Sequence, residues 1–198
     1  MMLRNLKQPT LGIAAALALM LGGIAMTGCT TTSTGSQASA QAARQAIDSD
    51  VDATLSRLYN TVPGSREMAQ KAAGVLVFPS VIGGSFVVGA EYGRGALRVD
   101  GRTTGYFSTT AGSVGFQAGG QSKAVIYIFN TKEALAKFLD SKGWTVGADA
   151  SVAIAKVGAN ASVNNYTAQQ PIVGYVLTNV GLEAGASVQG SKINRIEP

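Results

Sequence analysis

The sequence predicts an α+β protein, rich in β-structure, in which a strongly bent antiparallel or barrel-like sheet carries an N-terminal amphipathic helix and one inserted helix. Most of the chain after Gly74 alternates apolar with small or polar residues, which is the period of a half-buried strand. Two stretches show the helical period instead. Twenty glycines lie between Gly64 and Gly190, mostly in predicted strands and turns, and they favour a bent, closely packed sheet over a flat one.

The chain begins with the layout of a secretory signal peptide. Arg4 and Lys7 provide a positive start, residues 11–26 are apolar and uncharged, and small residues precede Cys29. About 16 apolar residues are fewer than the roughly 20 that cross a bilayer, so this segment is not expected to be a membrane span. We expect residues 1–28 to be removed.

The residues Met26-Thr27-Gly28-Cys29 resemble the lipobox of bacterial lipoproteins, in which the cysteine becomes the lipid-modified first residue. The alternative is an ordinary signal peptide with a chance cysteine. The resemblance implies lipid attachment at Cys29, which would anchor the protein by acyl chains without a spanning helix. Thr30, in place of an aspartate, implies transport to the outer membrane of a Gram-negative bacterium, with the domain facing the periplasm.

Charge and composition argue against several classes of function. Of 16 basic and 11 acidic residues, Arg4 and Lys7 precede Cys29, so the mature chain would carry a formal charge of +3. This weak charge favours an anionic surface, whereas no basic stripe with interleaved aromatic residues predicts nucleic-acid binding. The chain has no histidine, the commonest general base and zinc ligand, and an acylated Cys29 cannot be a nucleophile. We therefore expect no disulfide, metal or cofactor.

The mature chain is expected to start with a flexible tether over residues 29–41, because from Thr30 onward these are Thr, Ser, Gly, Gln and Ala without periodicity. Residues 42–198 are expected to form a single domain. A polar segment of this length would keep that domain within about 20 Å of the lipid anchor.

Residues 42–59 predict an amphipathic helix whose apolar side chains recur at spacings of three and four. This stripe can lie on a membrane or pack on the protein's own sheet. Packing is favoured because the helix carries aspartates where membrane-lying helices carry lysine and arginine. Pro63-Gly64 then predicts a turn, and Ser65 is expected to cap a short helix that ends near Ala73. The stripe consists of Ile47, Val51, Leu55 and Leu58.

Several short strands are predicted next. A strand over residues 74–78 is expected to stop at Pro79. Tyr92-Gly93-Arg94-Gly95 is expected to be a hairpin turn between strands at 85–92 and 96–99. Asp100-Gly101 is a stronger turn signal, and it precedes a strand over residues 103–107.

The stretch from Ala111 to Phe129 predicts a hairpin at the core of the fold. Residues 113–119 alternate as a half-buried strand, and residues 124–129 form a continuous apolar run. Gly119-Gly120 can adopt the positive backbone angles that a tight turn between these two strands requires.

The inserted helix is predicted over residues 131–141. Asn130 or Thr131 can cap it, and Gly143 fits its end. Its apolar stripe consists of Leu135, Phe138 and Leu139. Alternation after Trp144 predicts further strands at 146–154, 162–166, 172–178 and 182–188.

Three carboxylates lie on predicted strands among small residues: Glu91, Asp149 and Glu183. A buried pair of them could have a raised pKa and act as acid and base. The alternative is solvation on the strand surface, which is favoured because nothing in the sequence makes any two of them neighbours. We therefore expect a non-enzymatic protein without catalytic residues.

Six segments of the chain carry a family resemblance. They are Ala73-Gly-Val-Leu-Val-Phe-Pro, Gly83-Gly-Ser-Phe-Val-Val-Gly-Ala-Glu-Tyr-Gly-Arg-Gly, Gly112-Ser-Val-Gly-Phe-Gln-Ala-Gly-Gly-Gln-Ser, Glu133-Ala-Leu-Ala-Lys-Phe, Trp144-Thr-Val-Gly-Ala-Asp-Ala-Ser-Val-Ala and Gly181-Leu-Glu-Ala-Gly-Ala-Ser-Val-Gln-Gly. In this order they resemble the SYLF domain family, and together they cover most of residues 62–196. Eukaryotic members of that family bind phosphoinositide-containing membranes, partly through an amphipathic helix and basic residues, and a yeast member also binds and bundles actin. Bacterial members are commonly small lipoproteins.

The resemblance implies that residues 42–198 bind membrane phospholipid. An envelope or host protein is the alternative partner. The candidate residues for lipid phosphates are basic and surround the first predicted hairpins, although solubilising charge is an equal explanation for them. The apolar stripe matches the family's helix in position, while its aspartates depart from that helix's basic character. The expected lipid-binding residues are Arg94, Arg98, Arg102, Lys123, Ile47, Val51, Leu55 and Leu58.

Overall fold

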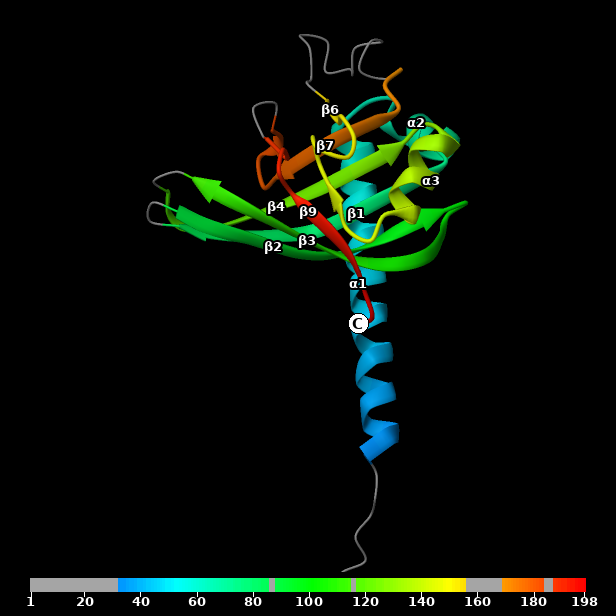
Figure 1. Ribbon diagram of the computed structural model, residues 1–198, viewed down its shortest axis with the longest axis vertical. Coiled ribbons are helices and arrows are strands. Elements are labelled where there is room, and N and C mark those ends of the chain that lie inside the picture. Colours follow the sequence, from blue (N-terminus) through cyan, green and yellow to red (C-terminus); the bar gives the residue numbers. More distant parts are fainter. Residues whose placement is uncertain (1–31, 86–87, 115–116, 156–168, 184–186) are drawn as a thin grey trace, which may run out of the picture.

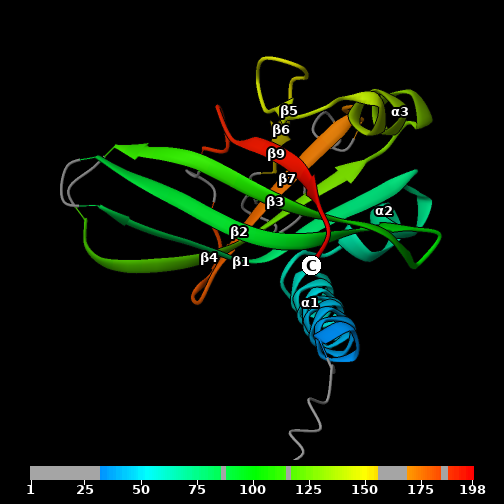
Figure 2. The same ribbon diagram turned by 60° about the horizontal axis from the view of Figure 1, so that its bottom comes forward.

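The computed structural model describes residues 32–85, 88–114, 117–155, 169–183 and 187–198. In this part of the chain, nine strands form one curled sheet that resembles half of a barrel, and helices cover both faces (Figures 1 and 2). The predicted α+β class with a strongly bent sheet is confirmed. Residues 1–28 and Cys29 lie outside the described residues.

The strands follow the order β5-β9-β3-β2-β1-β4-β7-β6, with β8 paired to β7. The described pairs are antiparallel except for β6 and β7, which run parallel. The elements are α1 (Thr32–Thr61), α2 (Ser65–Lys71), β1 (Gly74–Ser85), β2 (Val88–Val99), β3 (Arg102–Val114), β4 (Gln117–Phe129), α3 (Lys132–Asp140), β5 (Trp144–Thr145), β6 (Ala153–Ile154), β7 (Ile172–Thr178), β8 (Gly181–Leu182) and β9 (Lys192–Ile196).

β1 and β2 continue through positions where the sequence predicts an end and a turn. The register of β1 shifts between Val77 and Ser80, so Pro79 lies in a bulge where the ladder is already interrupted. Opposite the bulge the backbones approach closely. A Cβ on Gly93 would lie 2.8 Å from the carbonyl oxygen of Ser80, and one on Gly95 would overlap the carbonyl oxygen of Val77. These glycines therefore allow a close approach and do not form the predicted turn.

The turn between β2 and β3 is correctly predicted. Asp100 and Gly101 have φ values of 49° and 74°, which are the positive angles of the tight turn expected for Asp-Gly.

The hairpin predicted over residues 111–129 is wrong in its pairing. β3 and β4 are not neighbours, because β2 and β1 lie between them, and Gly119 and Gly120 lie inside β4. β1 takes the central place since Val75, Leu76, Val77 and Phe78 are buried in alternation on both faces. Such a strand needs apolar neighbours on both edges, and residues 124–129 of β4 supply one of them.

The region after Trp144 is also less regular than predicted. Val146 and Ala150 form an isolated bridge, and Gly147 between them has a φ of 90°. The predicted strand over 146–154 is therefore divided by a turn. The strand predicted at 172–178 is confirmed as β7, whereas the strand predicted at 162–166 lies outside the described residues.

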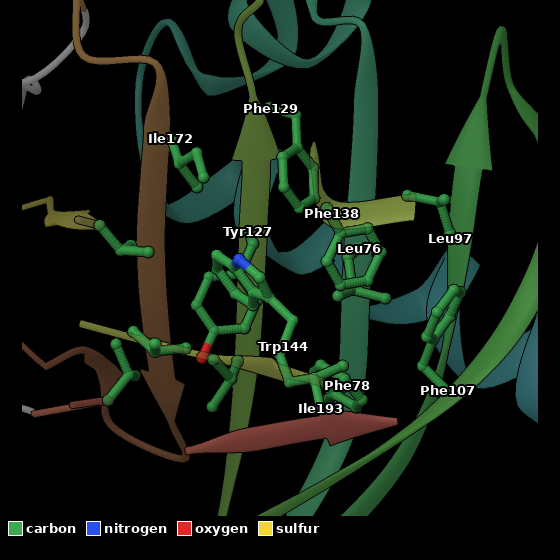
Figure 3. Close-up of a cluster of buried hydrophobic side chains, with 14 of the residues drawn as sticks. Leu76, Phe78, Leu97, Phe107, Tyr127, Phe129, Phe138, Trp144, Ile172 and Ile193 are labelled. Atoms are coloured by element: carbon green, nitrogen blue, oxygen red, sulfur yellow. The ribbon is translucent and has the colours of Figure 1, made fainter. Parts of the chain in front are cut away.

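Two apolar clusters hold the sheet, one on each face. The first, on the concave face, is rich in aromatic rings and includes residues of α3 (Figure 3). Phe138 of α3 lies 5.1 Å from Phe129 and 5.5 Å from Trp144, measured between ring centroids. The predicted inserted helix is confirmed, with the Thr131 side chain accepting a hydrogen bond from the Ala134 N–H as its cap.

The second cluster lies between the convex face and α1 with α2. Ile47, Val51 and Leu58 are buried there. The N-cap of α2 is Gly64 and not the predicted Ser65. Ser65 is itself buried, and its hydroxyl donates to the carbonyl oxygen of Val62. This bond ties the start of α2 to the end of α1.

α1 begins at Thr32, within the segment for which the sequence predicted a tether. Residues 36–46 are mostly exposed, and this part of α1 projects beyond the sheet (Figure 1). Few tertiary contacts support it there, so its helical form rests on the local preference of alanine and glutamine. At 1.5 Å per residue, the turns from Thr32 to Ile47 span about 22 Å.

Replacing Gly95 by alanine is expected to lower the free energy of unfolding by about 1–3 kcal/mol, because the added methyl group forces β1 and β2 apart at the bulge. Urea denaturation measures this change. Gly112→Ala is the matched control, since a Cβ at Gly112 meets nothing within 4 Å and should change stability by less than about 0.5 kcal/mol. Equal stability of the two variants would contradict the close approach.

Candidate functional site

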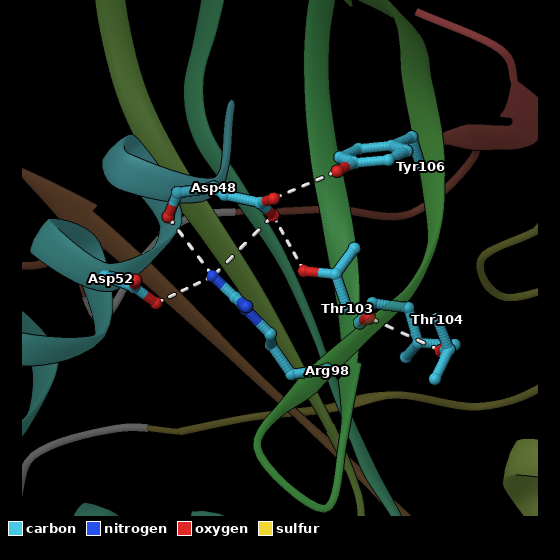
Figure 4. A network of polar contacts seen from close by, with 7 residues as sticks. Asp48, Asp52, Arg98, Thr103, Thr104 and Tyr106 are labelled. Carbon is cyan, nitrogen blue, oxygen red and sulfur yellow. Dashed lines mark hydrogen bonds and ion pairs between the residues drawn. The ribbon is translucent and has the colours of Figure 1, made fainter. Parts of the chain in front are cut away.

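A polar network fastens α1 to the sheet. Asp48 and Asp52 lie one turn apart on α1, so both carboxylates reach Arg98 of β2 (Figure 4). The Arg98 Nη2 lies 2.7 Å from Asp52 Oδ1 and 3.6 Å from Asp48 Oδ1. Asp48 also accepts hydrogen bonds from the hydroxyls of Thr103, at 2.7 Å, and Tyr106, at 2.9 Å. The network therefore joins α1 to β2 and β3.

Arg98 is consequently not free to bind a phosphate. Its side chain is only 14% exposed, and two carboxylates balance its charge. Burial, followed by the hydrogen bond to Asp48, raises the pKa of Tyr106 above its ordinary value, so the phenol remains a donor. We interpret Arg98 as a structural anchor, unlike the lipid-binding role expected from the sequence.

Lys123 is likewise engaged. Its ammonium group lies 3.0 Å from Glu91, and the two side chains are 21% and 20% exposed. Lys123 pairs with Val81 in the sheet register, and Val81 belongs to the concave cluster, so this ion pair lies on the concave face. Gly83 leaves room for it, since a Cβ there would lie 2.8 Å from the Glu91 Cγ.

The three candidate carboxylates have separate surroundings. Glu91 pairs with Lys123, Asp149 accepts the backbone N–H of Thr145 and closes a turn, and Glu183 is exposed. Among the described residues, none of them is hydrogen-bonded to another. The same residues contain no group of three or more histidine, cysteine or acidic side chains that could hold a metal ion.

Arg94 and Arg102 differ from Arg98 and Lys123 because both are exposed. Arg102 lies next to the Asp100-Gly101 turn. Arg94 lies two residues before Ala96 on β2, and Ala96 packs in the cluster beneath α1. Because strand side chains alternate, Arg94 also points to the convex face. No ion pair involving either arginine occurs among the described residues.

Arg94 belongs to a surface that we call the open face, because it continues the convex face beyond α1. Ile82 and Tyr92 are opposite each other in the register of β1 and β2, and they are 61% and 51% exposed. The Ser80 and Ser122 hydroxyls meet at 2.9 Å beside them. The open face consists of Ser80, Ile82, Tyr92, Arg94 and Ser122.

A cleft of about 340 Å³ separates the open face from α1. Ser80 belongs to both, so the cleft and the open face are continuous. The cleft is lined by Asp50, Ala53, Thr54, Arg57, Pro79 and Ser80. A second cleft of about 290 Å³ lies on the other side of α1, between Tyr59, Gln70 and Asp100.

The apolar candidates on α1 are positioned for packing. Ile47, Val51 and Leu58 are buried in the convex cluster, and Leu55 packs against it. Of the two positions considered from the sequence, on a membrane or on the protein's own sheet, the structure shows this helix packed on the sheet. None of the helices in the described part of the chain is long and apolar enough to cross a membrane.

These features define a curled-sheet domain with an exposed, partly basic surface and no assembled catalytic group among the described residues. Residues 110–197 match the sequence profile of a family described as Ysc84: Las17-binding protein actin regulator. This match over residues 110–197 agrees with the resemblance to the SYLF domain family predicted from the sequence. The comparison with curated proteins found no match. The matched segment runs from the end of β3 to β9, so Ile82, Tyr92 and Arg94 precede it.

Arg98→Met is expected to lower the free energy of unfolding by about 1.5–3 kcal/mol, the range for hydrogen bonds to charged groups, because it leaves Asp48 without its cation. Tyr106→Phe removes one hydroxyl donor to the same carboxylate and should cost about 1.5 kcal/mol, the lower end of that range, because the Tyr106 side chain is only partly buried. Arg94→Met makes the same chemical change at an exposed position of the same strand and should alter stability by less than about 0.5 kcal/mol. Thermal unfolding that is identical for Arg98→Met and Arg94→Met would contradict the anchoring role.

Proposed function

We propose that this protein is a lipid-anchored lipoprotein of the outer membrane whose domain binds anionic phospholipid without catalysing a reaction. The observation that carries the proposal is the exposed guanidinium of Arg94, which forms no ion pair within the described part of the chain and lies beside exposed apolar side chains on the open face. An arginine is suited to phosphate because its donors form a planar fork. The weakly basic net charge of the mature chain also favours an anionic ligand.

Attachment through Cys29 makes weak lipid binding sufficient. Acyl chains would hold the domain next to the bilayer, so contact with headgroups becomes an intramolecular step at high effective concentration. The periplasm is the proposed location, because it follows from the lipobox-like sequence and from Thr30 after the cysteine.

A protein partner in the envelope is the second candidate function. The description of the family as Las17-binding actin regulators favours it, since those proteins bind other proteins. In this case cross-linking in cells would join the domain to an envelope protein, and purified protein would not bind lipid.

The proposal is tested with the chain that starts at residue 29 and carries Cys29→Ser, so that no acyl chain contributes. This protein should sediment with vesicles of phosphatidylcholine and phosphatidylglycerol and not with phosphatidylcholine alone. Binding should weaken when salt is raised from about 0.05 to 0.5 M, since salt screens exposed charges. Failure to bind any anionic vesicle would overturn the proposal.

Arg94→Gln should reduce the vesicle partition coefficient about fivefold, since one basic residue near an anionic surface contributes about 1 kcal/mol. Arg94→Lys should retain most of the binding. Lys142→Gln is the charge-matched control, because Lys142 is exposed in the connection after α3 and lies outside the open face. Equal losses for Arg94→Gln and Lys142→Gln would show that only net charge matters and would remove Arg94 from the site.

A further inference from the structure

We infer that the open face of the sheet is the part of the domain that enters the membrane, with Ile82 and Tyr92 inserted among the lipid headgroups. This inference rests on the proposed lipid binding and specifies how it occurs. It assigns insertion to the sheet, whereas the sequence placed the apolar membrane contact on the first helix.

The exposed apolar side chains of the described residues are not evenly distributed. The large ones are Ile82, Tyr92, Leu139 and Val180, at 61%, 51%, 45% and 98% exposure. Leu139 lies on α3 and Val180 in the connection between β7 and β8. Single exposed apolar residues are ordinary on protein surfaces. Ile82 and Tyr92, however, are directly paired across two strands and form one patch.

The surroundings of this patch match a lipid surface in charge and polarity. Arg94 follows Tyr92 by two residues on the same face of β2. Residues with hydroxyl groups flank the Ile82–Tyr92 pair on the neighbouring strands. Thr110 of β3 is opposite Tyr92, and Ser122 of β4 is opposite Ile82. The acid of the same strand, Glu91, points to the concave face and pairs with Lys123.

The cleft beside the open face is lined by one acidic residue, Asp50, and by Arg57. The region around the patch therefore has two arginines, Arg57 and Arg94, for one aspartate. A phenol, an aliphatic side chain and guanidinium groups are the combination found where proteins meet the bilayer interface. The size of the patch also favours a membrane, because two side chains are far less than the roughly 800 Å² that each partner contributes to a stable protein interface.

α1 is the competing route into the membrane, and its packing opposes that role. Ile47, Val51 and Leu58 are buried in the convex cluster, so inserting them would first separate α1 from the sheet and break the Arg98 network. Ile82 and Tyr92 are already exposed on hydrogen-bonded strands. They can enter the headgroup layer without any change of fold.

Four single-cysteine proteins test the inference: Ile82→Cys, Tyr92→Cys, Leu139→Cys and Val180→Cys. Each is made in the chain from residue 29 with Cys29→Ser, which removes the only native cysteine, and is labelled with a polarity-sensitive fluorophore. All four positions are exposed, so folding should be preserved, and thermal unfolding verifies this. With vesicles of phosphatidylcholine and phosphatidylglycerol, the emission of labels at 82 and 92 should shift to the blue, while labels at 139 and 180 should not shift.

The outcomes separate the two claims. Binding without a shift at 82 and 92, or with an equal shift at 139 or 180, overturns the inference and leaves the proposed function standing. A blue shift at 82 and 92 that depends on protein concentration and not on vesicles also overturns it, in favour of contact between copies. Absence of vesicle binding by the unlabelled protein overturns the proposed function itself.

The unlabelled double variant Ile82→Ser with Tyr92→Ser provides a second readout. It should lose at least tenfold in vesicle binding at every salt concentration, because its charges are unchanged while its apolar contact is lost. Arg94→Gln should instead weaken the dependence on salt. A double variant that binds like the parent protein would overturn the inference.

Discussion

Burial of the central sheet on both faces is the constraint on which the rest of the structure depends. β1 carries apolar side chains on both faces between Val75 and Phe78, so neither face of this region can meet water. The concave face is covered by aromatic rings and α3, and the convex face by α1 and α2. The close approach at Gly93 and Gly95 lets β1 and β2 remain paired across the bulge. The covered region is therefore a packed sandwich, whereas Ile82 and Tyr92, on the strand ends beyond α1, are exposed.

The difference between the covered and the open parts of the sheet explains which basic side chains remain available to bind a ligand. Arg98 and Lys123 lie where helices or opposing side chains approach the sheet, so each would be buried without a partner if no carboxylate were near. Both consequently have acidic neighbours and contribute to the fold. Arg94 lies where the convex face is open and needs no partner. The proposed lipid contact thus uses the part of the sheet that the core does not require.

The projecting half of α1 changes how the domain would be held at a membrane. A random coil between the anchor and the domain would permit any orientation at short range, whereas helical turns from Thr32 set both a distance and a direction. The ion pair between Arg44 and Glu197, at 3.4 Å, connects this half of the helix to the C-terminal end of the chain.

The sequence by itself determined the class of fold, the family resemblance, the inserted helix, the Asp100-Gly101 turn and the apolar stripe of the first helix. All of these depend on local patterns of period, capping and turn chemistry. Only the tertiary structure decided which strands pair. The glycines at 93–95 and 119–120 have the local signature of turns, but long-range pairing keeps both groups inside strands.

The same limit applies to the candidate site. Arg94, Arg98, Arg102 and Lys123 are equivalent in the sequence, because nothing local reveals a carboxylate about 50 residues away, as Asp48 is from Arg98. The sequence did not single out Ile82 or Tyr92, since Ile82 lies between two predicted strands and Tyr92 is an apolar position of an alternating strand, where burial is expected. Their exposure results from where α1 ends its cover of the sheet, and that is a property of the packed structure alone.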